Sequence, residues 1–255
     1  MVDLAGKVAL ITGASRGIGA ATAKRLFARG VDVFLAANDT RANLEAAAAA
    51  CRDARTGTGR TEIGIFDFLK RDAAEAMVQT AYRALGRIDI LVNNAAIRIR
   101  QPFGGFSHDE FDKMVSVNLR APFFASQAVV PIMRIQGGGR IIHVASQMGI
   151  VAEQGSTLYG LTKAALIHLT RSMAFELAPE GIAVNAVSPG PTMTEYNRER
   201  TTKDPSLLEY KLSYIRAGRY GSPDEIAEAI EFLATTNATY IQGHNLVIDG
   251  GYIIH

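Results

Sequence analysis

Residues 8–19 of this 255-residue chain read VALITGASRGIG, and they decide the fold. The apolar run Val8–Thr12 is typical of a buried strand, and Gly17–Gly30 follows with a helical pattern. The glycines between them allow a tight turn, so that a pyrophosphate can approach the positive N-terminus of the helix. We therefore expect this turn to bind a dinucleotide through Gly13, Ser15, Arg16, Gly17, Ile18 and Gly19. The alternative is a structural turn that binds no ligand.

Gly13–Gly17 also matches the G-x-S-x-G nucleophile elbow of hydrolases, in which Ser15 would be the nucleophile. Here the turn follows the first strand, which leaves no earlier strands to complete a hydrolase sheet and its oxyanion loop. The histidines that could act as the base have no supporting context (His108, His143, His168, His244 and His255). The dinucleotide interpretation is therefore favoured.

Outward from the turn, short apolar runs alternate with longer helical patterns, which predicts a parallel sheet with helices on both faces. The predicted strands are Val8–Thr12, Val31–Ala36, Glu62–Phe66, Ile88–Asn93, Gly139–Ala145, Ile182–Ser188 and Asn245–Ile248. The predicted helices are Gly17–Gly30, Arg41–Arg52, Lys70–Leu85, Ser107–Gln136, Ser156–Ala178 and Ser222–Thr235. This alternation indicates an α/β fold, a Rossmann-type doubly wound sheet of about seven strands, as a single domain over residues 1–255. Pro189–Gly221 has no clear pattern, and we expect it to be a mobile lid over the substrate.

Composition excludes several classes of protein. The 27 Lys and Arg residues nearly balance the 25 Asp and Glu residues and form no basic stripe, which argues against a nucleic-acid partner. No run approaches the ~20 apolar residues of a membrane helix, and Val8–Ile11 leads directly into the glycine turn rather than forming a signal peptide. The single Cys51 fits a reducing compartment. We expect a cytoplasmic protein without a membrane partner or a metal site.

Tyr159 and Lys163 stand at i and i+4, so one helix face brings their side chains within reach of each other. A phenol has a pKa of about 10, and lowering it by roughly three units takes about 4 kcal/mol. One ammonium at ~5 Å in an effective dielectric of ~20 supplies about 3 kcal/mol of this, and an oxidised nicotinamide would supply the rest. The pair can therefore perform acid–base chemistry, although an isolated match of this kind is usually a surface pair.

Two further polar residues favour the chemical interpretation. Ser146 follows an apolar strand upstream of Tyr159, at the sheet edge where ligands of such folds bind. Asn118 lies in an otherwise apolar helical stretch and should need a hydrogen-bond partner.

With these motifs in this order, the chain resembles the short-chain dehydrogenase/reductase family, and its 3-oxoacyl-carrier-protein reductase branch in particular. The resemblance covers Gly6–Tyr252 and rests on Thr12–Gly19, Asp67, Asn93–Ala96, Asn118, Ser146, Tyr159, Lys163 and Pro189–Gly190. Two departures are Ala96, where glycine is more usual, and Ala145, where a first serine is common. Neither removes a residue of the Tyr–Lys–Ser–Asn set.

The resemblance implies an oxidoreductase that moves a hydride between a nicotinamide cofactor and a carbonyl or secondary alcohol. Tyr159 would exchange the proton, and Ser146 would bond the reacting oxygen. Lys163 would lower the pKa of Tyr159 and hold the nicotinamide ribose, while Asn118 would anchor a water that links Lys163 to solvent. The alternative is a catalytically idle regulatory protein that binds the same cofactor, but such a protein would be free to lose these four residues.

The resemblance also assigns the remaining cofactor contacts. Asn38, Asp67 and Phe68 would lie at the adenosine end, with Asp67 on the adenine amino group. Asn94 would contact a cofactor ribose beside Ala95 and Ala96. The nicotinamide would contact Tyr159, Lys163, Pro189, Gly190, Thr192 and Thr194.

We expect NADP(H) rather than NAD(H). The second strand ends at Ala37, where NAD-preferring proteins place an acid, and Asn38 follows where NADP enzymes often have Arg. Arg16 can face a 2′-phosphate. NAD(H) stays the alternative because Asp39 is close enough to reach a ribose, and because Arg16 can instead be a solvated turn residue.

The sequence indicates less about the substrate than about the cofactor. Arg98 and Arg100 alternate along one side of an extended segment, so they can together bind a carboxylate or phosphate, or simply be solvated. Gln147, Gln154 and Tyr196 are further candidate substrate contacts, whereas His143 is expected to pack in the core. The resemblance implies a homotetramer that pairs the helices near Ser107–Gln136 and Ser156–Ala178, with Gly243–His255 at another contact.

Overall fold

The computed structural model describes residues 4–54 and 59–254 of the chain. In that part, seven strands form one sheet with the order β3-β2-β1-β4-β5-β6-β7, and every neighbouring pair is parallel. The strands are β1 (Val8–Thr12), β2 (Asp32–Ala37), β3 (Thr61–Ile65), β4 (Ile90–Asn93), β5 (Gly139–Val144), β6 (Ile182–Pro189) and β7 (Asn245–Ile248). The predicted doubly wound parallel sheet is confirmed.

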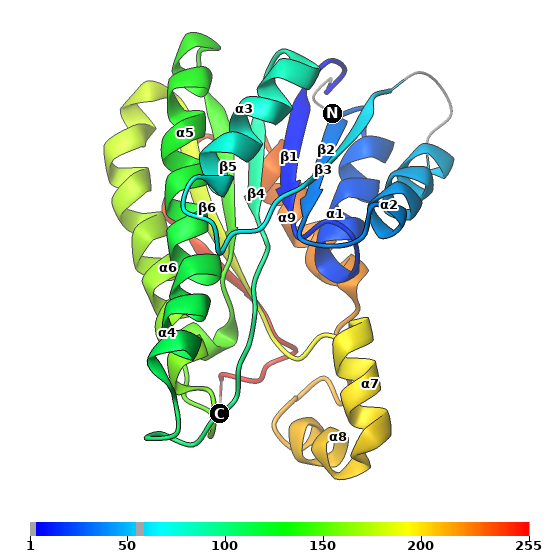
Figure 1. Cartoon of the computed structure of the whole chain (residues 1–255), viewed down its shortest axis with the longest axis vertical. Helices are drawn as coiled ribbons and strands as arrows, with labels where there is room; N and C mark the ends of the chain where they lie inside the picture. Colours follow the sequence, from blue (N-terminus) through cyan, green and yellow to red (C-terminus); the bar gives the residue numbers. More distant parts are fainter. Residues whose placement is uncertain (1–3, 55–58, 255) are drawn as a thin grey trace.

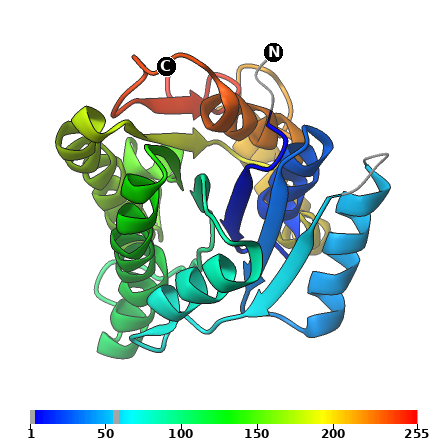
Figure 2. The ribbon, with the colours of Figure 1, turned by 90° about the horizontal axis from the view of Figure 1, so that it is seen from above.

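Helices cover both faces of this sheet (Figure 1; Figure 2). One side holds α1 (Gly17–Ala28), α2 (Arg41–Asp53) and α9 (Pro223–Thr235). The other holds α3 (Ala73–Leu85), α4 (His108–Val115), α5 (Ala121–Ile135) and α6 (Thr157–Leu177). Two shorter helices, α7 (Glu195–Lys203) and α8 (Pro205–Leu212), lie beyond one end of the sheet (Figure 1).

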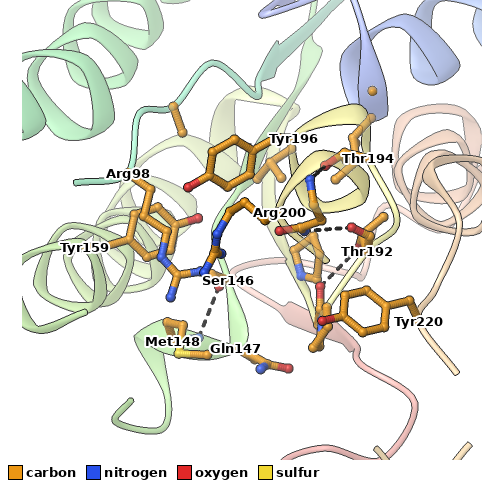
Figure 3. A pocket seen from close by; sticks show the side chains of 18 of the residues that line it. Arg98, Ser146, Gln147, Met148, Tyr159, Thr192, Thr194, Tyr196, Arg200 and Tyr220 are labelled. Atoms are coloured by element: carbon orange, nitrogen blue, oxygen red, sulfur yellow. Dashed lines mark hydrogen bonds between the residues drawn. The ribbon is translucent and has the colours of Figure 1, made fainter. Parts of the chain in front are cut away.

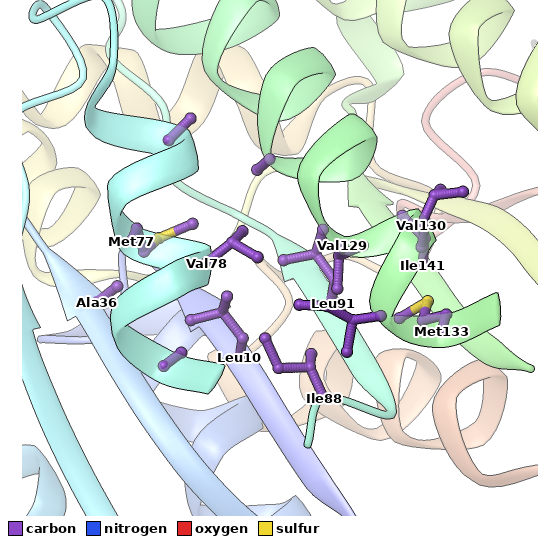
Figure 4. Packing of buried hydrophobic residues seen from close by; sticks show 14 of the residues in the cluster. Leu10, Ala36, Met77, Val78, Ile88, Leu91, Val129, Val130, Met133 and Ile141 are labelled. Carbon is purple, nitrogen blue, oxygen red and sulfur yellow. The ribbon is translucent and has the colours of Figure 1, made fainter. Parts of the chain in front are cut away.

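The apolar runs read as strands are continuous because both faces of each strand are buried. Val8 and Leu10 of β1 face the core under α3 and α5, while Ala9 and Ile11 face the core under α1 and α9. In the first core, Leu10 and Leu91 from neighbouring strands pack against α3 and α5 (Figure 4). The two cores hold the sheet rigid between its helical layers.

The predicted helix Ser107–Gln136 needs a correction, because it is not one uninterrupted α-helix. A π-helical turn at Ser116–Arg120 separates α4 from α5 and contains Asn118. π-turns are rare and commonly mark functional sites. The apolar periodicity continues across the turn, which is why the sequence pattern does not reveal it.

The segment Pro189–Gly221, in which the sequence shows no clear pattern, contains the two helices α7 and α8. Thr194 caps α7 by accepting a hydrogen bond from the Asn197 amide, and Asp204 caps α8 through the Ser206 amide. Neither helix has a buried residue, so neither carries the apolar stripe on which helix prediction depends.

The parallel topology brings the carboxyl ends of β1, β4, β5 and β6 to one edge. Gly13 and Asn94 directly follow β1 and β4, Ser146 lies two residues after the end of β5, and Pro189 is the last residue of β6. The strand order reverses at β1 and β4, and the crevice outside such a reversal is where ligands of open α/β sheets bind. Among the described helices, none combines the length and apolarity needed to span a lipid bilayer.

Candidate active site

The glycine turn is held in place by the loop that follows β4. The Thr12 hydroxyl accepts hydrogen bonds of 2.9 Å from the amides of Asn94 and Ala95. In return the Asn94 side-chain amide donates to the Thr12 carbonyl at 2.9 Å and to the Gly13 carbonyl at 3.2 Å. The side-chain nitrogen of Asn94, a residue expected to contact a cofactor ribose, therefore fastens two loops together.

The turn also brings the first turn of α1 close to Gly13, the first residue after β1. A Cβ at Gly19 would lie 2.2 Å from the Gly13 carbonyl oxygen, so no side chain fits there. Gly13 and Gly17 have φ of 64° and 57°, the left-handed region that favours glycine. The side chain of the N-cap residue Arg16 makes no capping hydrogen bond to α1. The first backbone N–H groups of α1 are therefore free to meet a ligand. Such a cradle fits a pyrophosphate.

At the carboxyl edge lies a cavity of about 600 Å³, bounded by the glycine turn, the loops after β4, β5 and β6, and helices α7 and α8. Most of the predicted site residues line it, namely Arg16, Gly17, Ile18, Asn94, Ala96, Arg98, Arg100, Ser146, Gln147, Tyr159, Lys163, Pro189, Gly190, Thr192, Thr194 and Tyr196. Six of the described strands and α-helices supply lining residues, namely α1, β5, β6, α6, α7 and α8, and the segments between them supply the rest. Helices α7 and α8 together form one wall of the cavity.

Several predicted residues lie outside this lining. Gly13, Ser15, Gly19 and Ala95 belong to the glycine turn and the loop after β4. Asn38, Asp67 and Phe68 follow the carboxyl ends of β2 and β3. Gln154 is exposed, and its carbonyl accepts a hydrogen bond from Arg100. The lining residues that the sequence pattern missed include Glu195, Arg200 and Lys211, which belong to the two unpredicted helices.

Hydrogen bonds between short polar side chains connect the residues expected at an adenosine. Asn38 donates to the Asp67 carboxylate at 3.4 Å. A hydrogen bond from Ser15, followed by bonds from Asn43 and the Thr40 amide, holds the pKa of Asp39 below its usual value. The Phe68 side chain packs in the core, so a cofactor contact at this residue would use its backbone.

Tyr159 and Ser146 meet in the cavity, from α6 and from the end of β5 (Figure 3). Burial raises the pKa of the Tyr159 phenol, and the Arg98 guanidinium and a hydrogen bond with Ser146 offset part of this rise. The Arg98 guanidinium carbon lies 5.0 Å from the centre of the Tyr159 ring. The sequence-based estimate therefore omitted both the cost of burial and the nearer cation.

Lys163 lies on the same face of α6, with its ammonium 5.6 Å from the centre of the Tyr159 ring. The ammonium donates to the Val144 carbonyl at 2.7 Å, and burial lowers the pKa of Lys163 to about 7. Lys163 is thus a buried side chain rather than a surface partner of Tyr159.

Asn118 is fully buried and has the partners that its position requires. Its side-chain oxygen accepts from the Ile97 amide at 2.9 Å, and its nitrogen donates to the Ile97 carbonyl at 2.9 Å and to the Thr162 hydroxyl at 3.2 Å. Both N–H groups are used, so the side chain ties the π-turn to the β4 loop and to α6.

Arg98 and Arg100 are paired rather than solvated. Both donate to one oxygen of Glu153, at 3.1 Å and 2.5 Å, and Lys211 of α8 forms an ion pair with the other oxygen. Only 4% of the Glu153 side chain is exposed. Glu153 is missing from the sequence prediction because a lone acid in a loop has no pattern that marks it.

His143 packs in the core as expected. It is fully buried, its Nδ1 lies 3.2 Å from the Asn93 side-chain nitrogen, and burial lowers its pKa to about 3. It is therefore neutral at physiological pH.

Comparison with known proteins identifies the chain. The family model described as enoyl-(acyl carrier protein) reductase matches residues 13–253. The 3-oxoacyl-[acyl-carrier-protein] reductase FabG of Thermotoga maritima is 37% identical over 251 residues, which cover 98% of this chain and 99% of that protein. The chain belongs to the short-chain dehydrogenase/reductase family.

Similarity to solved structures supports the same family assignment. A putative short-chain alcohol dehydrogenase from Sinorhizobium meliloti has a TM-score of 0.92 and 33% identity, covering 99% of this chain and 98% of that one. A putative 2-deoxy-d-gluconate 3-dehydrogenase from Agrobacterium tumefaciens with bound NADP has a TM-score of 0.89 and 32% identity, covering 99% and 98%. The chain is an NAD(P)-dependent oxidoreductase, and the glycine cradle described above fits such a cofactor.

The lowered pKa of Lys163 predicts a pH dependence of stability. Its unfolded pKa is about 10.4, so between about pH 7 and pH 10 the unfolded chain binds more protons at this residue, and stability rises with pH. Lys163→Met should remove a slope of up to ~1.4 kcal/mol per pH unit. Urea unfolding without cofactor at pH 7, 8 and 9 measures it, and an unchanged slope in the variant would contradict the assignment.

Proposed function

We propose that the protein interconverts a carbonyl and a secondary alcohol, with Tyr159 as the group that exchanges the proton. The observation that carries this proposal is the convergence of Tyr159, Ser146 and Lys163 at one end of the cavity that begins at the glycine turn. A bound nicotinamide supplies or accepts the hydride. The protein's own residues then have to bind the reacting oxygen and manage its charge.

In the direction of reduction, Ser146 donates a hydrogen bond to the carbonyl oxygen, and Tyr159 gives its proton to that oxygen as negative charge develops there. The resulting phenolate is stabilised by the Arg98 guanidinium beside the ring and by Lys163 when its amine is protonated. In the direction of oxidation, the same phenolate takes the proton of the alcohol. Asn118 positions α6 against the β4 loop and so keeps these groups aligned.

Replacing Tyr159 with Phe removes the transferred proton and leaves the shape of the cavity. Turnover should fall by about 10²- to 10⁴-fold, while the dissociation constant of the reduced cofactor stays within a few-fold of the parent value. Steady-state rates and cofactor fluorescence measure the two quantities. Tyr240→Phe is the matched control, because the Tyr240 side chain is fully exposed, and activity retained by Tyr159→Phe would refute the mechanism.

For the cofactor, we propose a preference for NADP(H) over NAD(H). Arg16 is exposed at the turn and lines the cavity, and β2 ends at Ala37 without an acid. Asp39 is held by Ser15, Thr40 and Asn43 rather than free to bind a ribose. The similar structure from Agrobacterium tumefaciens, in which NADP is bound, supports the same choice.

Arg16→Ala should lower kcat/KM for NADPH by about 10-fold, the typical effect of one hydrogen bond to a charged group, and leave that for NADH nearly unchanged. Arg41→Ala, on the exposed side of α2, is the control. A parent enzyme that prefers NADH would contradict the proposal.

We propose that residues 1–255 form one domain and that residues 189–221 form a lid over the substrate. We also propose that the protein is located in the cytoplasm. A homotetramer is supported by large apolar side chains on the outer surfaces of α5 and α6, since Phe123, Ile135 and Phe175 are 44%, 86% and 87% exposed. Light scattering should give the mass of four chains, and a monomer at micromolar concentration would exclude this assembly.

A further inference from the structure

Three cations gather around one carboxylate beside Tyr159. Arg98 and Arg100 come from the loop after β4, Lys211 comes from α8, and all three line the cavity while they contact Glu153. We call these four residues the Glu153 cluster. Its members come from three separate segments, so only the tertiary fold assembles it.

The Glu153 cluster carries a surplus of two positive charges. In the described part of the chain, Glu153 is the one carboxylate within ion-pair distance of these three cations. The side chains are largely withdrawn from water, with 21% of Arg98 and 13% of Lys211 exposed. Burial is the main cause that lowers the pKa of both Arg98 and Lys211. A buried surplus of charge is costly unless an anion compensates it.

Hydrogen-bond donors in the cluster are also unused. The Nε of Arg98 and one terminal nitrogen of Arg100, Nη1, are buried and have no hydrogen-bond partner. Buried donors normally have an acceptor, and a guanidinium forks naturally onto a carboxylate or phosphate. An anionic acceptor would satisfy the donors and the charge together.

The cluster lies beside the reacting centre. The Arg98 guanidinium carbon is 5.0 Å from the centre of the Tyr159 ring. Arg98 and Arg200 both extend into the part of the cavity near Ser146 and Tyr159 (Figure 3). A group bound by these cations would therefore belong to the same small molecule whose oxygen reaches Tyr159.

We propose that the Glu153 cluster is an oxyanion subsite, and that the substrate is a small carbonyl compound or alcohol that carries a carboxylate or phosphate group near the reacting carbon. This inference rests on the proposed function of the same site. Glu153 holds the two arginines and Lys211 in place, and the surplus charge binds the substrate. The competing explanation is that the cations only fasten α8 to the loop before α6.

Binding is tested first, without turnover. The enzyme saturated with oxidised cofactor is titrated calorimetrically with malonate and, separately, with inorganic phosphate. Arg100→Met should weaken binding of the preferred anion by about 10- to 100-fold, and Arg100→Lys, which keeps the charge, should weaken it less. Arg134→Met, at an exposed ion pair with Glu180, is the control for loss of one surface arginine.

Preference for malonate identifies a carboxylate subsite and preference for phosphate a phosphate subsite. Absence of binding by both anions, or equal binding by the parent and Arg100→Met, overturns the proposal. Thermal unfolding of each variant shows whether it is folded, and if Arg100→Met fails to fold, Arg100→Lys against the parent decides in the same way.

Turnover then separates this inference from the proposed function. Acetoacetate and its ethyl ester share a carbonyl and differ in charge, as do dihydroxyacetone phosphate and dihydroxyacetone. Arg100→Met should lower kcat/KM for the charged member of the active pair by about 10-fold or more, mainly through KM, and change the neutral member little. Equal losses for both members overturn the subsite. If no carbonyl is reduced while anion binding still depends on Arg100, the proposed function fails and the subsite stands.

Discussion

The close contact between Gly13 and Gly19 constrains the rest of the site. With a Cβ at Gly19, the start of α1 could not approach the Gly13 carbonyl, and the outward N–H groups of α1 would shift. The Asn94 side chain and the Thr12 hydroxyl lock this turn to the loop after β4. The same loop continues to Arg98, so the place for a pyrophosphate and the place for a substrate are fixed relative to each other by one short run of hydrogen bonds.

Burial and charge oppose each other around Tyr159. Withdrawal from water raises the pKa of the phenol and lowers that of Lys163, and both effects hold the groups in their neutral forms. Arg98 acts in the other direction on Tyr159, and it is itself held by Glu153 and Ser156. The acid–base group and the oxyanion subsite therefore share one cation, which couples substrate charge to the chemistry.

The sequence predicted the elements whose residues are buried in a regular order. β1 alternates between two cores, and its apolar run was found with the observed bounds. α7 has no buried residue and was missed. The π-turn at Asn118 was also missed, because one extra residue in a helical turn leaves the surrounding apolar pattern readable as a single helix. Tyr159, Lys163 and Ser146 were found from spacing and position, but their pKa shifts depend on burial, which spacing does not report.

The sequence by itself determined the parallel sheet, the glycine turn and the class of reaction, since each follows from local periodicity or from a short motif with one physical purpose. Only the tertiary structure decided what surrounds the glycine turn and Tyr159. Glu153 and Lys211 lie far apart in the chain, and an ion pair between them has no local signal. The unpaired donors of Arg98 and Arg100 became visible for the same reason, because satisfaction of a hydrogen bond is a property of neighbours in space.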